Sequence, residues 1–338
     1  MKLERLDPDR VEWERLDRFS DRLVYQTREW VEFIARAQQA EPIVAALVAG
    51  AATVGYFTGL VQRRFGITIL GSPMPGWTTA FMGFNLEPGV SRRTAVEALV
   101  PFAFGELRCA HLELRDRNLL ASDLGGLGLK QTPWTGIEVD LRRAEEEIWA
   151  SIKAPCRTAI RKAQRHGVTV EEATGADFAE DFYPQLEDVF AKQALVPPYG
   201  IERVRELIRY VYPSGRLLLL RARDANGECI ATGIFPGMNR TMHFLAGASL
   251  RRHQHLRPNE ALMWYAMTHW KSRGIEACDL GGLLSYKRKW GGREVHVPFI
   301  CTSRFRTIAL MRDAAKTAYG ARQAMRARMK FHRLQRRN

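Results

Sequence analysis

Two apolar stretches of the chain are candidates for the same kind of buried element. Residues 43–61, IVAALVAGAATVGYFTGLV, contain no charged side chain. Their length is close to that of a membrane-spanning helix, and Gly55 and Gly59 form the GxxxG spacing found in such helices. The alternative is a pair of buried strands joined by a turn near Gly50, which the glycines, threonines and β-branched residues favour.

A second stretch decides between these alternatives. Residues 217–235, LLLLRARDANGECIATGIF, show the same order of strand, turn and strand, and Asp224, Asn226 and Gly227 mark the turn. The charges around this turn prevent the second copy from crossing a membrane. Because the two stretches are alike, we expect residues 43–61 to form a hairpin and the chain to have no transmembrane segment.

The likeness between the two halves continues beyond the hairpins. In each half a helix and a short strand follow, at residues 92–116 and 259–282, and both helices carry Glu-Ala-Leu near their start. These corresponding segments lie about half a chain apart. The repeat predicts an α/β (α+β) fold of two tandem domains, each a mixed sheet packed by helices. We place the domains at residues 1–142 and 143–310, and a basic amphipathic helix at residues 311–338.

The positive charge of the chain is concentrated near its C-terminal end. The formal net charge is +14, and residues 304–338 contribute +10 of it, from 11 basic residues and one acidic residue. Such a helix can dock its apolar stripe on the body and present cations to RNA. It can also lie on an anionic membrane surface, or serve only solubility. The sequence leaves these three interpretations open.

Several common kinds of catalytic centre are missing from the sequence. None of the five cysteines is paired at the short spacing that zinc sites use, and His253 and His255 lack a third ligand nearby. There is no GxSxG, HExxH or GxxxxGK[ST] motif. The charged N-terminus is unlike a secretory signal. We expect free thiols, no metal, no tightly bound cofactor, and a cytoplasmic protein, in solution or peripheral to the membrane.

Two basic clusters are candidates for binding an anion. One is the loop before the helix expected at residue 259, because helix N-termini receive phosphate well; its candidate residues are Arg251, Arg252, Arg257 and Asn259. The other is a stripe in which Lys153, Arg157 and Arg161 recur every four residues. A wet loop with a capped helix and a solvated helix face are the competing interpretations.

Residues 285–292, SYKRKWGG, place cations among aromatic side chains and glycines. In an extended strand, Tyr286 and Trp290 would point to one face, and Lys287 and Lys289 to the other. A fixed cation can stabilise the negative charge that develops on a carbonyl oxygen during acyl transfer. A basic edge strand that resists aggregation is the competing interpretation.

Four motifs, taken in order, resemble the FemAB-type proteins, a family of duplicated GNAT-fold transferases that includes peptidoglycan aminoacyl ligases. The motifs are YQTREWVEFIA, IKAPCRTAIRKAQRHGVTVE, LRPNEALMWYAMTHWKSRGIEACDLGG and YKRKWGG, and together they span residues 25–292. The chain departs from the family pattern in having Tyr286 where Phe is usual, and it lacks the long insertion that forms a coiled-coil arm in some relatives. The loop after Arg251 also lacks the glycines with which ordinary GNAT domains hold the coenzyme A pyrophosphate.

The resemblance implies two tandem GNAT-like domains and an acyl- or aminoacyltransferase. The amine acceptor, a peptide, sugar or cell-wall precursor, is expected in the cleft between the domains. Lys287 is the implied catalytic residue, as oxyanion donor, and the loop residues Arg251, Arg252, Arg257 and Asn259 are the implied donor-phosphate ligands. The implied substrate-binding residues are Trp30, Lys153, Arg157, Arg161 and Tyr286.

The donor follows less directly from the sequence. The missing glycines and the basic C-terminal segment favour aminoacyl-tRNA over acyl-CoA, so tRNA is an expected partner. One alternative is an acyl-CoA-dependent N-acyltransferase of cell-envelope or polysaccharide metabolism. A second alternative is a non-catalytic protein that binds RNA or a membrane surface through the helix stripe and the basic tail.

Overall fold

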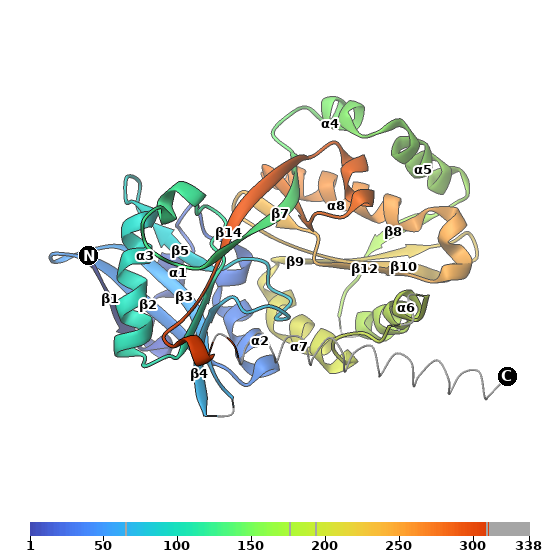
Figure 1. The fold of residues 1–338 in the computed structure, drawn as a ribbon. Coiled ribbons are helices and arrows are strands. Elements are labelled where there is room, and N and C mark those ends of the chain that lie inside the picture. Colours follow the sequence, from blue (N-terminus) through green and yellow to red (C-terminus); the bar gives the residue numbers. More distant parts are fainter. Residues whose placement is uncertain (65, 176, 193–194, 309, 311–338) are drawn as a thin grey trace.

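The computed structural model describes residues 1–310 apart from 65, 176, 193–194 and 309. The expected amphipathic helix at residues 311–338 therefore lies outside the described residues. The described strands form one 14-stranded sheet that runs through both halves of the chain, in the order β1-β2-β3-β4-β6-β14-β7-β13-β11-β10-β9-β8, with β5 beside β3 and β12 beside β10. The two halves lie side by side in Figure 1 and are joined by β7 and β14.

The first half is a hairpin-rich sheet with helices on both faces. Its strands are β1 (Lys2–Leu6), β2 (Glu41–Ala49), β3 (Ala52–Arg64), β4 (Ile67–Ser72), β5 (Gly83–Leu86), β6 (His111–Leu114) and β7 (Gln131–Asp140). Its helices are α1 (Trp13–Leu16), α2 (Arg28–Gln38) and α3 (Arg92–Pro101). The helix α3 covers an apolar core that contains Phe57, Phe84 and Leu99, and α2 covers the opposite face through Trp30 and Phe33.

The second half repeats this plan. Its strands are β8 (Thr169–Glu172), β9 (Leu217–Arg223), β10 (Cys229–Met238), β11 (Thr241–His243), β12 (Ala246–Ser249), β13 (Ala277–Gly282) and β14 (Arg293–Ser303). Its helices are α4 (Glu145–Ser151), α5 (Ala154–Arg165), α6 (Phe178–Lys192), α7 (Ile201–Val211) and α8 (Pro258–Ser272). Each half has one parallel strand pair, β4 with β6 in the first and β11 with β13 in the second.

The two predicted hairpins are confirmed. Residues 43–61 lie in the antiparallel pair β2–β3, which turns at Gly50 with a positive φ of 62°. Residues 217–235 lie in the pair β9–β10. None of the helices in the described part of the chain has the length and apolar composition needed to span a bilayer. The helices α4 and α5 are separate elements, and Pro155 stands in the first turn of α5.

The strand at the end of each half crosses to the other half. The strand β7 precedes the expected boundary at residue 142, yet it pairs with β13. The strand β14 comes from the second half, yet its last residues pair with β6. Between these contacts β14 and β7 pair with each other along residues 293–300, so they form a two-stranded ribbon that closes both sheets (Figure 1).

The expected strand at residues 285–290 is wrong. Residues Ser285–Trp290 form a short 3-10 helix, η7, which ends at Gly291 in the left-handed region. A Cβ at Gly291 would lie 2.4 Å from the carbonyl oxygen of Ser151, and the Lys153 amide donates to the Lys289 carbonyl at 2.9 Å. The start of α5 therefore packs against this segment, and it does so only because residue 291 has no side chain.

Candidate functional site

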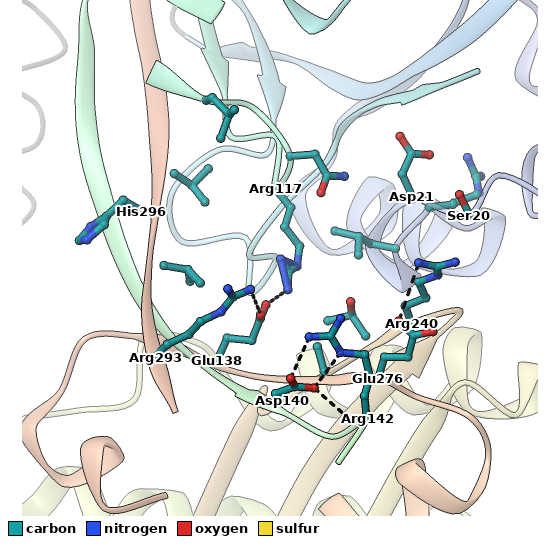
Figure 2. Close-up of a pocket in the computed structure, with 18 of the residues that line it drawn as sticks. Ser20, Asp21, Arg117, Glu138, Asp140, Arg142, Arg240, Glu276, Arg293 and His296 are labelled. Atoms are coloured by element: carbon teal, nitrogen blue, oxygen red, sulfur yellow. Dashed lines mark hydrogen bonds and ion pairs between the residues drawn. The ribbon is translucent and has the colours of Figure 1, made fainter. Parts of the chain in front are cut away.

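A cleft of about 650 Å³ lies where the two halves meet, over the β7–β14 ribbon. Residues of both halves line it, and its walls carry both arginines and carboxylates (Figure 2). The cations are Arg22, Arg92, Arg117, Arg142, Arg240 and Arg293, and the carboxylates are Asp21, Glu138, Asp140, Glu276 and Glu294, with His296 at one edge. A cleft of this composition suits a polar ligand that carries charges of both signs.

A row of titratable side chains crosses the sheet at the inner end of this cleft. The register pairs His243 of β11 with Asp279 of β13, Asp279 with Glu138 of β7, and Glu138 with Arg293 of β14. Paired residues of neighbouring strands point to the same face of the sheet. Arg117 and Arg293 both form ion pairs with Glu138 and converge on it in Figure 2.

The inner end of the row is buried. His243 and Asp279 are 2% and 3% exposed, and His243 Nδ1 lies 3.2 Å from Asp279 Oδ2. The other oxygen of Asp279 accepts the Gly281 amide at 2.7 Å. Burial raises the pKa of Asp279, but the bond to His243, the charges of His243 and Arg117, and the Gly281 amide together hold it below its ordinary value. Burial lowers the pKa of His243, so the imidazole is neutral at pH 7.

The parallel strands β11 and β13 separate directly beyond this pair. The ladder ends where the Phe244 amide donates to the Asp279 carbonyl at 2.8 Å, and the following strand β12 pairs with β10 instead. Lys287 of η7 lies at this divergence. Its Nζ donates to the Gly282 carbonyl at 3.2 Å and lies 5.8 Å from the centre of the Phe244 ring.

Lys287 is the buried lysine of the segment that the sequence singled out, at 8% exposure. Burial lowers the pKa of its ammonium, and the charge of Asp279 partly offsets this. The expectation that Lys287 and Lys289 share a face is wrong, because η7 is helical and Lys289 instead forms an ion pair with Glu260 at 2.8 Å. Tyr286 is half exposed at the surface rather than packed behind the lysine.

The expected donor-phosphate loop forms a 3-10 turn, η6 (Arg251–Leu256), before α8. Arg251 and Arg257 are exposed there, and Arg257 is the N-cap of α8 with a positive φ of 63°. Arg252 forms an ion pair with Glu228, which engages its guanidinium within the protein. Asn259 donates to Ser249 Oγ at 2.9 Å, tying the helix start to β12.

The expected substrate-binding residues do not gather in one place. Arg157 donates to the Ala150 carbonyl at 2.9 Å, and Arg161 lies over the Trp149 ring at 5.3 Å. Lys153 is exposed at the start of α5, beside η7. Trp30 is 0% exposed, and its Nε1 donates to Thr79 Oγ1 at 3.0 Å, so in this conformation its ring belongs to the core.

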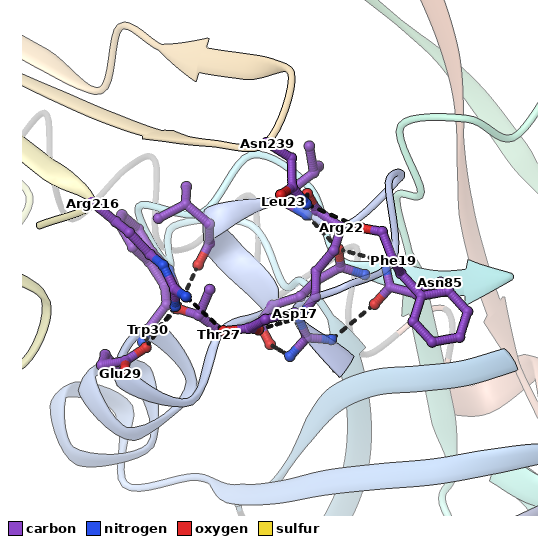
Figure 3. A network of polar contacts seen from close by, with 12 residues as sticks. Asp17, Phe19, Arg22, Leu23, Thr27, Glu29, Trp30, Asn85, Arg216 and Asn239 are labelled. Carbon is purple, nitrogen blue, oxygen red and sulfur yellow. Dashed lines mark hydrogen bonds and ion pairs between the residues drawn. The ribbon is translucent and has the colours of Figure 1, made fainter. Parts of the chain in front are cut away.

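A polar network holds the first-half segment beneath the cleft against the second half (Figure 3). Arg22 is fully buried and donates to Asp17 at 2.8 Å and to Asn85 at 2.9 Å. Arg216 of the second half donates to the other oxygen of Asp17 at 2.6 Å. Asn239 donates to the carbonyl of Arg22 at 3.0 Å. Asp17 therefore bridges two arginines, one from each half.

Two groups of side chains in the described residues have the composition of a metal site. In the buried group of His111, Glu113 and Cys301, the histidine contacts Glu113 at 3.2 Å and Ser303 Oγ at 2.7 Å, so both ring nitrogens have protein partners. In the surface group of Asp224, Glu228 and His253, Glu228 is engaged by Arg252.

Sequence reasoning missed His243, Asp279, Glu138 and Arg117. The available signal was a polar residue in an apolar strand, since His243 stands in RTMHFLAGAS and Asp279 in ACDLGG. His243 and Asp279 are 36 residues apart in the sequence, and the parallel register of β11 and β13 brings them together.

Residues 150–288, somewhat less than half of the chain, match the family model described as an acetyltransferase (GNAT) domain. No curated protein matches the chain significantly. A crystal structure of FemX is similar over 89% of this chain and 97% of its own, with a TM-score of 0.71 and 12% sequence identity. The structure of L-PGS from Bacillus licheniformis is similar over 88% of this chain and 98% of its own, with a TM-score of 0.55 and 10% identity.

A tandem GNAT protein from the clavulanic acid biosynthesis pathway has a TM-score of 0.50 and 12% identity, covering 89% of this chain and 98% of that one. The identities are low, so these likenesses establish the fold. The predicted fold of two tandem GNAT-like units is confirmed. The family match in the second half agrees with the prediction of an acyltransferase of the GNAT class.

Proposed function

Because the chain has the fold of the FemAB-like tandem GNAT transferases, we propose that it transfers an activated aminoacyl group to an amine, with aminoacyl-tRNA as the donor. The observation that carries this proposal is the position of Lys287. Its ammonium lies where β11 and β13 diverge, and these two strands carry Thr241 and Ala277, which line the charged cleft between the halves. A cation held there stabilises the oxyanion that forms when an amine attacks an ester carbonyl.

The acceptor occupies the cleft in this proposal, and the donor approaches from the opposite side of the strand divergence. Arg251 and Arg257 stand before α8 and Asn259 stands in its first turn, where the helix N-terminus favours phosphate. Arg252 can contact the donor only if its ion pair with Glu228 breaks. Lys153 and Tyr286 are exposed beside η7, whereas Arg157, Arg161 and Trp30 act through packing unless the donor displaces their present contacts.

Aminoacyl-tRNA is favoured by the charge of the chain and by one class of structural neighbour. Residues 304–338 carry +10, which suits a polyanion. A neighbour from Agrobacterium fabrum, with a TM-score of 0.54 and 12% identity, is described as the C-terminal domain of a putative lysylphosphatidylglycerol synthetase. Acyl-CoA is the second candidate donor, because the clavulanic acid pathway protein is described with reference to AcCoA. The location that fits these substrates is the cytoplasm or the inner membrane surface.

The donor can be tested with the full chain and two labelled donors. Radiolabelled aminoacyl-tRNAs and acetyl-CoA are offered in separate reactions, with a lysine-containing pentapeptide and glucosamine as acceptor probes. We expect label to enter an amide product from the aminoacyl-tRNAs, and no transfer without protein. Transfer from acetyl-CoA alone would assign the acyl-CoA activity instead, and binding of tRNA without transfer from either donor would indicate the non-catalytic alternative.

A further inference from the structure

In the His243–Asp279 pair, Nδ1 of the histidine contacts the aspartate, and the other ring nitrogen, Nε2, has no hydrogen-bond partner among the described residues. An ionised carboxylate can only accept hydrogen bonds, so the proton between His243 Nδ1 and Asp279 Oδ2 must belong to Nδ1. In a neutral imidazole this leaves Nε2 with a free lone pair. In the described part of the chain, Nε2 is buried and has no hydrogen-bond partner. Buried polar atoms are nearly always paired, so this one requires an explanation.

Position connects this nitrogen to the cleft. Thr241 and Ala277 line the cleft, and they precede His243 and Asp279 by two residues on the same strands. Residues two apart on a strand point to the same face and lie about 6–7 Å apart. The sheet face that forms the floor of the cleft thus continues to His243, and there it meets the strand divergence that Lys287 occupies.

The surroundings of the imidazole fix its orientation. The Tyr25 ring, from the 3-10 turn η2 (Val24–Gln26), lies 4.5 Å from the imidazole centre, and the Phe81 ring lies 6.5 Å away. The charged groups that act on His243 are Asp279, Arg117 and Glu138. Arg117 and Glu138 form an ion pair with each other, so Asp279 is the charge that remains to orient the ring. A histidine oriented by a carboxylate, with its second nitrogen free, has the arrangement of a general base.

We propose that His243 is the proton acceptor for the attacking amine and that Asp279 orients it. This inference rests on the proposed function. As the amine nitrogen bonds to the donor carbonyl carbon, Nε2 takes one of its protons, and the oxyanion forms beside Lys287. When the tetrahedral intermediate collapses, the bond from carbon to the ribose oxygen breaks and the imidazolium returns the proton to that oxygen. The products are an amide and a free tRNA 3′ end, so atoms and charge balance.

The test compares two buried histidines with the same substitution. In His243→Gln, and separately in His243→Asn, no proton acceptor remains, and we expect kcat to fall about 10²–10⁴-fold with the acceptor KM nearly unchanged. The matched control is His111→Gln, in a buried histidine of the first half whose ring nitrogens are both partnered; its kcat should stay within about threefold of wild type. Asp279→Asn should lower kcat and leave the acceptor KM nearly unchanged, because it removes orientation rather than binding.

Each outcome bears on one statement. The reactions use labelled aminoacyl-tRNAs with the pentapeptide probe, on variants shown by thermal melting to be folded; if one His243 variant does not fold, the other decides. Wild-type protein that transfers the label while a folded His243 variant keeps a third or more of its kcat would overturn this inference and leave the proposed function standing. Wild-type protein that transfers from neither donor would overturn the proposed function, and this inference with it.

Discussion

The two parallel strand pairs of the molecule, β4–β6 and β11–β13, occupy corresponding places in the two halves. They differ in the side chain that packs beside them. In the first half, Met74 packs so closely on Gly71 of β4 that a Cβ there would lie 2.3 Å from Met74 Cγ. In the second half, β11 and β13 open onto the ammonium of Lys287. The corresponding strand pairs therefore have a methionine packed on β4 in the first half and a buried lysine beside β13 in the second half.

Each strand pair contains a buried histidine, and the two histidines differ in the hydrogen-bond partners of their ring nitrogens. His111 in β6 has Glu113 on one ring nitrogen and Ser303 on the other. His243 in β11 has Asp279 on one nitrogen and no partner among the described residues on the other. A fully partnered buried polar group adds to stability, whereas an unpartnered one costs stability and requires an explanation. This difference agrees with the proposal that the second half carries the reactive groups, and the family match also falls in that half.

We expect the largest effect, a loss of turnover, when the buried cation beside the second strand pair is replaced by an apolar side chain. Lys287→Met replaces the ammonium by an apolar side chain like that of Met74, and we expect turnover to fall about 10²–10³-fold, the usual loss for one oxyanion donor. Folding should be preserved, because the ammonium is buried and its removal relieves desolvation. Steady-state kinetics and a thermal melt check both statements. Lys289→Met is the control, since it removes only the ion pair with Glu260; equal losses in the two variants would contradict the special place of Lys287.

The next largest effect, on the free energy of unfolding, should follow from breaking the ion pairs that join the two halves. Asp17→Ala leaves the fully buried guanidinium of Arg22 and the inter-half Arg216 without their shared carboxylate. We expect the free energy of unfolding to fall by about 3 kcal/mol, at the lower end of the range for breaking a buried ion pair because Asp17 is partly exposed. Chemical denaturation measures it. Glu180→Ala, which breaks an exposed pair with Arg205, should cost less than about 1 kcal/mol.

The form of the Asp17→Ala transition also tests the comparison. The sheet is continuous through both halves, so the variant should unfold in one step with fluorescence and circular dichroism curves that coincide. Two separate transitions, one of them at the wild-type denaturant concentration, would show that the copies are independent folding units.

The smallest effect on the free energy of unfolding should come from substitutions in the two hairpin turns, where the two halves are most alike. Gly50 and Gly227 both turn with positive φ, 62° and 83°, and a Cβ at either would meet nothing within 4 Å. Gly50→Ala and Gly227→Ala should therefore each lower the free energy of unfolding by about 1–2 kcal/mol, the cost of the left-handed region for a residue with a side chain. Denaturation of the two variants in parallel gives the difference. A loss well above this in only one of them would mean that the turns are not equivalent.

The sequence predicted those features that depend on nearby residues. The hairpins are visible because Asp224, Asn226 and Gly227 mark one turn and the other stretch has the same pattern. The 3-10 helix at Ser285–Trp290 was missed because alternating side chains suggested a strand, whereas Gly291 and the backbone bond from Lys153 to Lys289 determine its path. That bond joins residues 136 positions apart, and local patterns do not report such contacts.

The candidate site was predicted in part for the same reason. Lys287 stands in a recognisable motif, but its burial follows from packing against Phe244 and Gly282. The row from His243 to Arg293 is a consequence of strand register across four strands. Each of its members is a single polar residue in its own segment, so nothing in the sequence of any one segment shows that they meet.

The exchange of strands between the halves has a consequence for how the chain is made. Residues 300–303 of β14 supply the partner of β6, so the N-terminal half lacks one of its strands until the ribosome has completed nearly the whole described chain. Until then the β6 edge is open, and an open edge can pair with other chains. N-terminal units of many proteins fold during synthesis, whereas this one completes its sheet only after the C-terminal half has emerged.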